Sequence, residues 1–243
     1  MSHVIEDLKA GRIPQAVLDE IGPFSIEAHN AHVASLQSSA TYNVFGNQFN
    51  VAPGLYHPHP SSSSVFVLRT LLRERPKLGR LLEIGGGAGT VGLSLLSHGL
   101  ADEVVLTDVD ENSVQIARSN AEKLGLCGRA TVKHGSMFKP VAGARFDSVL
   151  FNMPLMHLLY PGAKHIALDD TSGVVAKAFF REVQNHLAPG GTCFFTFSNI
   201  SDSKLLDQFA DMVDLSLVAA EWAVANGFWL MVYRFTNPPQ TAI

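Results

Sequence analysis

The sequence predicts an α/β fold, a doubly wound and mostly parallel sheet with an antiparallel last strand, preceded by a small helical cap. Apolar strand-like segments alternate with amphipathic helical segments through short turns, a pattern typical of parallel sheets covered by helices. A glycine-rich turn follows the first strand, at residues 85–89. Near the end, Asn226-Gly227 separates two apolar runs, which indicates a tight antiparallel turn.

The composition of the chain limits the classes of function that it can have. The chain has 243 residues, 47% of them hydrophobic and 16% charged, enough for one large globular domain with an extension. No apolar run reaches the ~20 residues that cross a bilayer, and the first residues lack the basic start of an export signal, so we expect a cytoplasmic protein. The net charge of -4, without any Lys/Arg cluster, argues against a nucleic-acid partner. The two cysteines, Cys127 and Cys193, are expected to be thiols, not a disulfide or zinc pair.

The first part of the chain predicts a cap over the main domain. Residues 4–36 hold short apolar patterns broken by glycine and proline, which indicates two or three small helices without a core of their own. Tyr42 to Val51 reads as a hairpin around Gly46-Asn47. Residues 53–64 are irregular and are expected to cross the mouth of a ligand site. We therefore divide the chain into residues 1–64, a cap and substrate-covering segment, and residues 65–243, a ligand-binding domain.

The sequence of the main domain predicts strands and helices in alternation. Its first helix runs from Val65 to Arg75, with serines before it as N-caps. Strand 81–84, helix 91–98 and strand 103–108 follow, and then a helix to Leu124 that is capped by Asp110 or Asn112. Strands 129–134 and 146–151 complete the first half. An irregular stretch to Thr171 precedes a long helix to Leu187, stopped by Pro189-Gly190-Gly191. Strand 194–197, helix 203–213 and strands 217–223 and 228–235 complete the chain.

Two interpretations of the glycine-rich turn compete. The run from Gly87 to Gly92 fits the dinucleotide pattern G-x-G-x-x-G, with Asp108 about 20 residues further on. Glu83-x-Gly85-x-Gly87-x-Gly89 is the other pattern. The strand is expected to end at Ile84. The Glu83-x-Gly85 pattern then begins directly at the strand end, whereas the dinucleotide pattern begins three residues late, at Gly87. An acid at the strand end can pair with a cation but would repel a pyrophosphate, which favours the second pattern.

The second pattern resembles motif I of the class I S-adenosylmethionine (SAM) methyltransferases. The resemblance covers residues 51–235 and is nearest to the small-domain group that includes release-factor glutamine methyltransferases and ribosomal RNA guanine-N2 methyltransferases. It implies a seven-stranded, Rossmann-like fold and SAM as the cofactor. Asp108 would accept hydrogen bonds from the ribose hydroxyls, and Ser136 stands where the family usually has an acid beside adenine. The cofactor residues that it implies are Glu83, Gly85, Gly87, Gly89, Thr90, Asp108, Val109, Ser136, Met137 and Asn152.

The acceptor site departs from the pattern of this group. Asn152-Met153-Pro154-Leu155 stands where the group has Asn-Pro-Pro-Tyr. The resemblance implies that Asn152 and the adjacent backbone carbonyl accept hydrogen bonds from the target amine. Leu155 cannot stack as an aromatic ring does, which favours a small acceptor over a nucleobase or a protein glutamine. The substrate residues expected here are Tyr56, His57, His59, Pro154, Leu155 and His165.

A general base is needed only if the acceptor loses its proton early, and histidine titrates near neutral pH. We expect Asn152, His157 and Tyr160 to be the catalytic residues. His57, His59, His157 and His165 could hold a metal ion, but two irregular loops give no ligand geometry, so no metal is expected. A purely structural role of Asn152, as the cap of a turn, stays open as an alternative.

The hypothesis is therefore a SAM-dependent methyltransferase that acts by direct displacement on nitrogen, or alternatively oxygen, of a small molecule in a biosynthetic pathway. The segment from Tyr42 to Ser64 would close its site. Three alternatives stay open: a protein glutamine N5-methyltransferase, a non-catalytic SAM-binding interaction module, and an NAD-dependent oxidoreductase.

Overall fold

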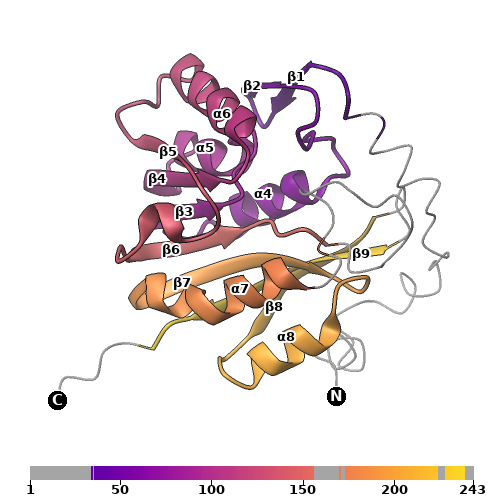
Figure 1. The fold of residues 1–243 in the computed structure, drawn as a ribbon, viewed down its shortest axis with the longest axis vertical. Helices are drawn as coiled ribbons and strands as arrows, with labels where there is room; N and C mark the ends of the chain where they lie inside the picture. Colours follow the sequence, from indigo (N-terminus) through magenta and orange to yellow (C-terminus); the bar gives the residue numbers. More distant parts are fainter. Residues whose placement is uncertain (1–33, 35, 156–169, 171–172, 224–227, 239–243) are drawn as a thin grey trace.

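A computed structural model describes residues 34, 36–155, 170, 173–223 and 228–238 (Figure 1). Within them, a seven-stranded sheet has the order β5-β4-β3-β6-β7-β9-β8. Strands β3 to β7 are parallel, and β9 is antiparallel to both β7 and β8, which confirms the predicted fold class. The strands are β3 (Gly79–Ile84), β4 (Ala101–Asp108), β5 (Ala130–His134), β6 (Phe146–Phe151), β7 (Leu187–Ser198), β8 (Ser216–Ala223) and β9 (Phe228–Thr236).

Helices cover both faces of this sheet, and each face has its own hydrophobic core (Figure 1). On one face the core includes side chains of α4 (Ser63–Glu74), α5 (Thr90–Ser97) and α6 (Glu111–Lys123). On the other face it includes α7 (Val174–Glu182), α8 (Ser203–Ala210) and the two short 3-10 helices η1 (Lys139–Val141) and η2 (Val183–His186). The chain order reverses between β3 and β6, and ligands of such sheets bind at the carboxyl ends of the strands at this point.

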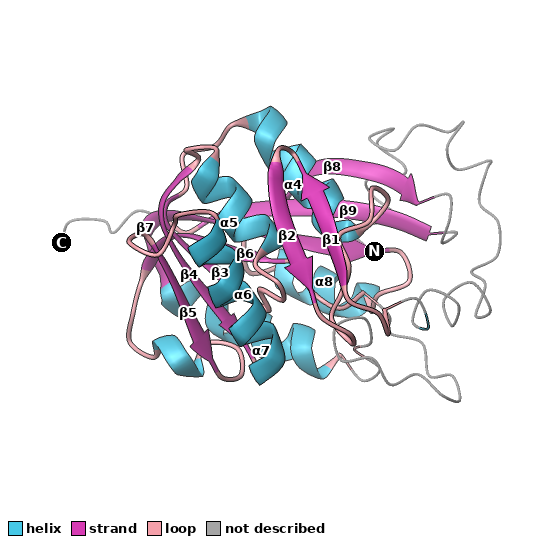
Figure 2. Cartoon of the chain, turned by 90° about the horizontal axis from the view of Figure 1, so that it is seen from above, coloured by secondary structure: helices cyan, strands magenta, loops and turns pink. Residues whose placement is uncertain are grey.

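A separate hairpin, β1 (Ala40–Val44) and β2 (Asn47–Val51), packs beside α6 (Figure 2). The prediction placed its turn at Gly46-Asn47, one residue too late. Val44 pairs with Asn47, so the two loop residues are Phe45 and Gly46, with φ of 47° and 87°. Positive φ at both loop residues is the type I′ geometry that matches the strand twist. Asn47 therefore belongs to the ladder.

The helices and strands after residue 170 differ from the prediction in their bounds. The predicted helix to Leu187 ends as an α-helix at Glu182, and β7 already begins at Leu187 and runs through Pro189-Gly190-Gly191. The backbone of Gly190 donates to Asn237, and the backbone of Asn237 donates to Gly191. The sequence Pro189-Gly190-Gly191 predicts a break, but its hydrogen bonds with Asn237, the residue after β9, keep it in the sheet. Helix α8 ends at Ala210, before the predicted Val213.

Some expectations concern other parts of the chain. The helices predicted within residues 4–36 and the turn at Asn226-Gly227 lie outside the described residues, apart from Ala34 and Leu36. The division at residue 64 stays a prediction. Within the described ranges, none of the helices combines the length and the apolar composition that crossing a bilayer requires.

Candidate functional site

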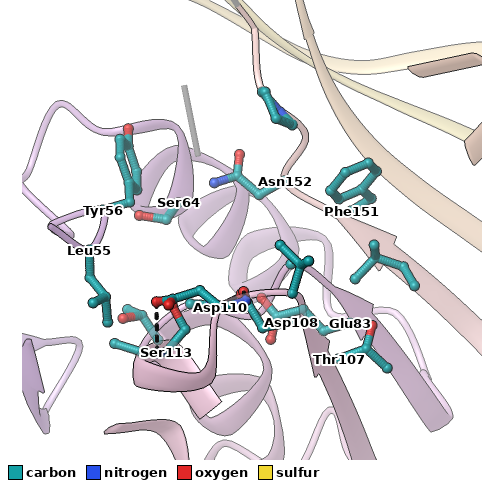
Figure 3. Close-up of a pocket in the computed structure, with 18 of the residues that line it drawn as sticks. Leu55, Tyr56, Ser64, Glu83, Thr107, Asp108, Asp110, Ser113, Phe151 and Asn152 are labelled. Carbon is teal, nitrogen blue, oxygen red and sulfur yellow. Dashed lines mark hydrogen bonds between the residues drawn. The ribbon is translucent and has the colours of Figure 1, made fainter. Parts of the chain in front are cut away.

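A cleft of about 680 Å³ lies at the carboxyl ends of β3, β4 and β6, and residues 53–56 form another of its walls (Figure 3). This volume is within the range of small-molecule and cofactor sites. The sequence-predicted residues that line it are Tyr56, Glu83, Gly85, Gly87, Thr90, Asp108, Val109, Ser136, Met137, Asn152 and Pro154. Sequence positions up to about a hundred residues apart thus meet at one cavity.

The glycine turn follows β3 directly. The strand ends at Ile84 and α5 begins at Thr90, so the turn starts where the Glu83-x-Gly85 pattern places it. Gly87 has φ of 53°, and a Cβ there would meet no atom within 4 Å, so its backbone faces open space. Gly89 does not line the cleft. A Cβ at Gly89 would lie 2.7 Å from the side chain of Leu93, so this glycine serves the packing of the turn on its own helix.

Glu83 is a buried acid at the end of β3. Its side chain is 2% exposed, and its Oε2 accepts a hydrogen bond of 2.8 Å from the backbone N–H of Gly92. Burial, together with the nearby Asp108, raises the pKa of Glu83 to about 8 against the lowering effect of the Gly92 hydrogen bond. The sequence suggested a carboxylate here. At neutral pH, the group is instead mostly protonated until a cation reaches it.

Asp108 ends β4 on the neighbouring side of the cleft. Its Oδ2 accepts from the backbone N–H of Gly87 at 2.8 Å, and its Oδ1 accepts from that of Asp110 at 2.9 Å. Burial raises the pKa of this carboxyl group, although both hydrogen bonds oppose the shift. Each carboxylate oxygen has a second lone pair. Asp108 therefore holds the turn in place and can still accept hydrogen bonds from a ligand hydroxyl.

Asn152 and Tyr56 lie on opposite sides of the upper cleft (Figure 3). Asn152 follows β6, and its Oδ1 accepts a hydrogen bond of 3.0 Å from the hydroxyl of Thr196. The Tyr56 hydroxyl accepts from the backbone N–H of Ser63 at the start of α4, at 3.1 Å. Burial raises the pKa of the Tyr56 phenol. Both side chains are thus fixed by elements of the main domain.

Several predicted substrate and catalytic residues do not line the cleft. His57 is 1% exposed, and its Nδ1 lies 3.0 Å from the Tyr42 hydroxyl, so it ties the segment to the hairpin. His59 packs against Tyr42 as well. Leu155 is buried in the core because its side chain is apolar, and its carbonyl accepts from Ser201. The remaining three, His157, Tyr160 and His165, lie outside the described residues.

Asn120 is a residue that the sequence reasoning missed. It is fully buried on α6, and its Nδ2 donates to the carbonyls of Asn50 in β2 and Ala88 in the glycine turn, while its Oδ1 accepts from the backbone of Asn50. One amide thus joins the hairpin to the glycine turn. An available signal was its place on the apolar stripe of α6, three residues after Ala117. A polar residue on such a stripe needs a partner.

The lining has a distinct charge. Among the described residues, neither lysine nor arginine lines the cleft, whereas Glu83, Asp108 and Asp110 do. The same part of the chain has no cluster of three or more His, Cys, Asp or Glu side chains that could hold a metal ion. Acids that can accept hydrogen bonds from hydroxyls, together with an open glycine backbone, suit a neutral or cationic nucleoside. They do not suit a pyrophosphate, as the dinucleotide interpretation requires.

Comparisons with known proteins agree with this geometry. A family described as methyltransferase small domain matches residues 46–225. The release factor glutamine methyltransferase of Bacteroides thetaiotaomicron is 32% identical over 111 residues, 45% of this chain and 38% of that protein. The ribosomal RNA small subunit methyltransferase C of Salmonella gallinarum is 29% identical over 158 residues, 65% of this chain and 42% of that protein. The chain thus spans less than half of these relatives.

Solved structures share the fold. A methyltransferase from Pyrococcus furiosus has a TM-score of 0.57 and 19% identity, and the alignment covers 87% of this chain and 97% of that one. The tRNA m1G37 methyltransferase of M. jannaschii has a TM-score of 0.59 and 12% identity, with 84% and 58% covered.

Proposed function

The chain belongs to the methyltransferase small domain family, and from this premise we propose that it is a SAM-dependent methyltransferase that methylates nitrogen, or alternatively oxygen, of a small molecule. The observation that carries the proposal is the convergence of Glu83, Asp108 and Asn152 on one acidic cleft at the strand ends. The dinucleotide alternative loses support because this cleft has acids where a pyrophosphate would lie.

The residues present fit SAM, which when bound supplies an electrophilic methyl group on a sulfonium. Asp108 accepts hydrogen bonds from the ribose hydroxyls, and Val109 and Met137 lie beside the adenine. The backbone of Gly85 and Gly87, which is open at Gly87, takes the middle of the cofactor. Glu83 faces its cationic amino-acid end. The support for these roles is that all six residues line the same cavity.

The chain's contribution to the reaction is alignment and exclusion of water. A displacement at carbon needs the nucleophile in line with the leaving group, and correct placement of two partners is worth ~7–11 kcal/mol. Asn152 hydrogen-bonds to the acceptor, and Tyr56 and Pro154 limit its space. His157, Tyr160 and His165 stay proposed acceptor-side residues. A base among them matters only for an acceptor that loses its proton early.

A small acceptor is supported by charge and by shape. The net charge is -4, and the described lining of the cleft has no cation to bind a phosphate backbone. The side chain of Leu155 lies in the core, so position 155 offers no ring for stacking on a nucleobase. A second candidate, methylation of a protein glutamine, is favoured by the release factor glutamine methyltransferases among the relatives.

The test starts with binding. Calorimetry should give saturable binding of SAM and S-adenosylhomocysteine, and S-adenosylhomocysteine but not NAD should raise the melting temperature. Protein stabilised by NAD alone would overturn the proposal.

Labelled SAM is then offered with fractionated metabolites, a protein extract and ribosomal RNA in parallel. Label in a metabolite fraction, lost in Asn152→Ala, supports the small acceptor. Label in a protein band or in RNA contradicts it. Tight cofactor binding without transfer to any fraction indicates the non-catalytic binding module.

A further inference from the structure

Met137 has a strained backbone conformation at the cleft. Among the described residues, Phe45, Arg75 and Met137 have positive φ without being glycine. Phe45 is a loop residue of the hairpin, and Arg75 is the left-handed C-cap of α4. Met137, with φ of 53°, instead lies in the loop after β5 and lines the cleft. Such residues persist only where their surroundings fix them, and they cluster at functional sites.

The side chain of Thr107 fixes this conformation. Thr107 lies in β4 at the cleft beside Asp108 (Figure 3) and is 1% exposed. Its hydroxyl donates to the carbonyl of Met137 at 3.1 Å. Its backbone carbonyl accepts from the N–H of Gly86 in the glycine turn, also at 3.1 Å. Any residue at position 107 can form the backbone bond, whereas the bond to Met137 needs a side-chain donor, which valine in the same space would lack.

The loop is tied to β4 at two points. The backbone N–H of Gly135 donates to the carbonyl of Asp108 at 2.8 Å, two residues before the carbonyl that Thr107 holds. The residue after Met137, Phe138, is 1% exposed in the core, so the chain passes from the cleft into the core within one residue. The positive φ of Met137 makes this change of direction. Without the hydroxyl, its carbonyl loses its donor, and relaxation to negative φ moves residues 136 and 137 away from the cleft.

We propose that Thr107 is a positioning residue for the cofactor. Its hydroxyl keeps Met137 in the left-handed conformation, and residues 136–137 then form a fixed wall beside the nucleobase. The inference rests on the proposed binding of SAM with Met137 beside the adenine. It goes further by assigning the shape of the nucleobase wall to a side chain on the neighbouring strand, which acts through Met137.

The first experiment compares three variants. Thr107→Val removes the hydroxyl at nearly constant volume, Thr107→Ser keeps it, and Thr192→Val makes the same change in β7, outside the lining of the cleft. Calorimetry measures the affinities for S-adenosylhomocysteine and for adenosine, which lacks the amino-acid end. We expect Thr107→Val to weaken both ligands about tenfold, the upper end of what the loss of one neutral hydrogen bond produces. Thr107→Ser and Thr192→Val should bind like the wild type. Thr107→Ala, which also lacks the hydroxyl, replaces Thr107→Val if that variant does not fold.

A second comparison tests whether the hydroxyl acts through the conformation of Met137. Glycine adopts positive φ without strain, so Met137→Gly should make the Thr107 hydroxyl less important, whatever its own effect on affinity. In the Met137→Gly background, Thr107→Val should therefore weaken S-adenosylhomocysteine binding no more than about threefold, a coupling that a double-mutant cycle measures. A purely structural role of Thr107 predicts the same loss in both backgrounds.

The outcomes separate the two proposals. Wild-type affinity of Thr107→Val, an equal loss in Thr107→Ser, or equal losses in the two backgrounds overturns the positioning role and leaves the proposed function standing. A loss of affinity for S-adenosylhomocysteine but not for adenosine also overturns it, because the effect then lies at the amino-acid end. A wild type that binds neither SAM nor S-adenosylhomocysteine overturns the proposed function, and the inference falls with it.

Discussion

The carboxyl group of Glu83 carries a proton at neutral pH because burial and the neighbouring Asp108 disfavour its charge. A cation that binds in the cleft favours the ionised form, so binding and loss of this proton are linked. The backbone N–H of Gly92 donates to the same carboxyl group and keeps it in place in either protonation state. We therefore expect this residue to make the cofactor affinity depend on pH.

We expect the affinity of the wild type for S-adenosylhomocysteine, which has a cationic ammonium group, to rise up to about tenfold per pH unit below pH 8 and to level off above it. Glu83→Gln should show weaker binding without this slope. The raised pKa of Glu83 stabilises the folded state at pH values below 4.5, the ordinary pKa of a glutamate. This contribution is lost as the pH rises through about 8. Glu83→Gln should therefore unfold at a higher temperature than the wild type at pH 9 but not at pH 4.

Calorimetric titrations from pH 6 to 9 measure the affinity. Glu103→Gln, an exposed acid at the opposite end of the sheet, is the control and should keep the wild-type slope. A pH-independent affinity of the wild type would contradict the assignment.

Gly92 shows a second effect of a single residue. A Cβ there would lie 2.4 Å from Glu83 Oε2 and 3.1 Å from Val104. Gly92→Ala is expected to displace the Glu83 carboxyl group, to destabilise the fold by ~1–3 kcal/mol and to weaken S-adenosylhomocysteine binding. Gly128→Ala adds a methyl group where no atom lies within 4 Å and should change neither. Equal melting temperatures and affinities for the two variants would show that the helix shifts to make room.

At the scale of elements, the hairpin and the glycine turn are held together by α6. Asn120 forms hydrogen bonds with both, and residues 53–56, which follow the hairpin, form a wall of the cleft. The hairpin therefore sets the position of that wall relative to the turn. This coupling is a property of three elements and cannot be assigned to one of them.

Asn120→Ala is expected to cost ~2–3 kcal/mol, about 1 kcal/mol for each of its three hydrogen bonds, and to weaken S-adenosylhomocysteine binding about tenfold. Asn50→Ala is the matched control, because Asn120 contacts only the backbone of Asn50. Chemical denaturation and calorimetry measure both effects. If Asn50→Ala loses as much affinity as Asn120→Ala, the side chain of Asn50, and not the hydrogen bonds of Asn120, is responsible.

The elements also show what the sequence could predict. Strand and helix positions around the glycine turn followed from local patterns, since β6 has the predicted bounds and Ser62 caps α4 through the N–H of Val65. Features set by distant partners did not. Pairing with Asn237 keeps Pro189-Gly190-Gly191 in a strand, and the three bonds of Asn120 depend on segments 70 and 32 residues away. Local propensity holds no information on such contacts.

At the scale of the molecule, the cleft is assembled from segments spread between Pro53 and Val175. Its walls come from residues 53–56, from the ends of β3, β4 and β6, and from residues 135–137. The packed helices on both faces of the sheet keep these segments in register. Cofactor binding should therefore depend on regions that a domain division at residue 64 would separate.

We expect a chain that begins at residue 65 to lose measurable binding of S-adenosylhomocysteine and to melt at a lower temperature than the full chain. Phe49 and Val51 are buried in the hairpin, and their loss would uncover the apolar surface of α6 beneath them. Calorimetry and thermal unfolding of the two proteins give the answer. A chain from residue 65 that binds as tightly as the full protein would show that the wall at residues 53–56 is dispensable.

The hairpin turn also bears on how this protein can be cut for expression. The family match begins at residue 46, between the two strands, so a fragment designed from that boundary would keep β2 and discard its partner β1. The orphaned strand edge would then be open to other chains, and such edges promote aggregation. A stable fragment has to start upstream of Ala40.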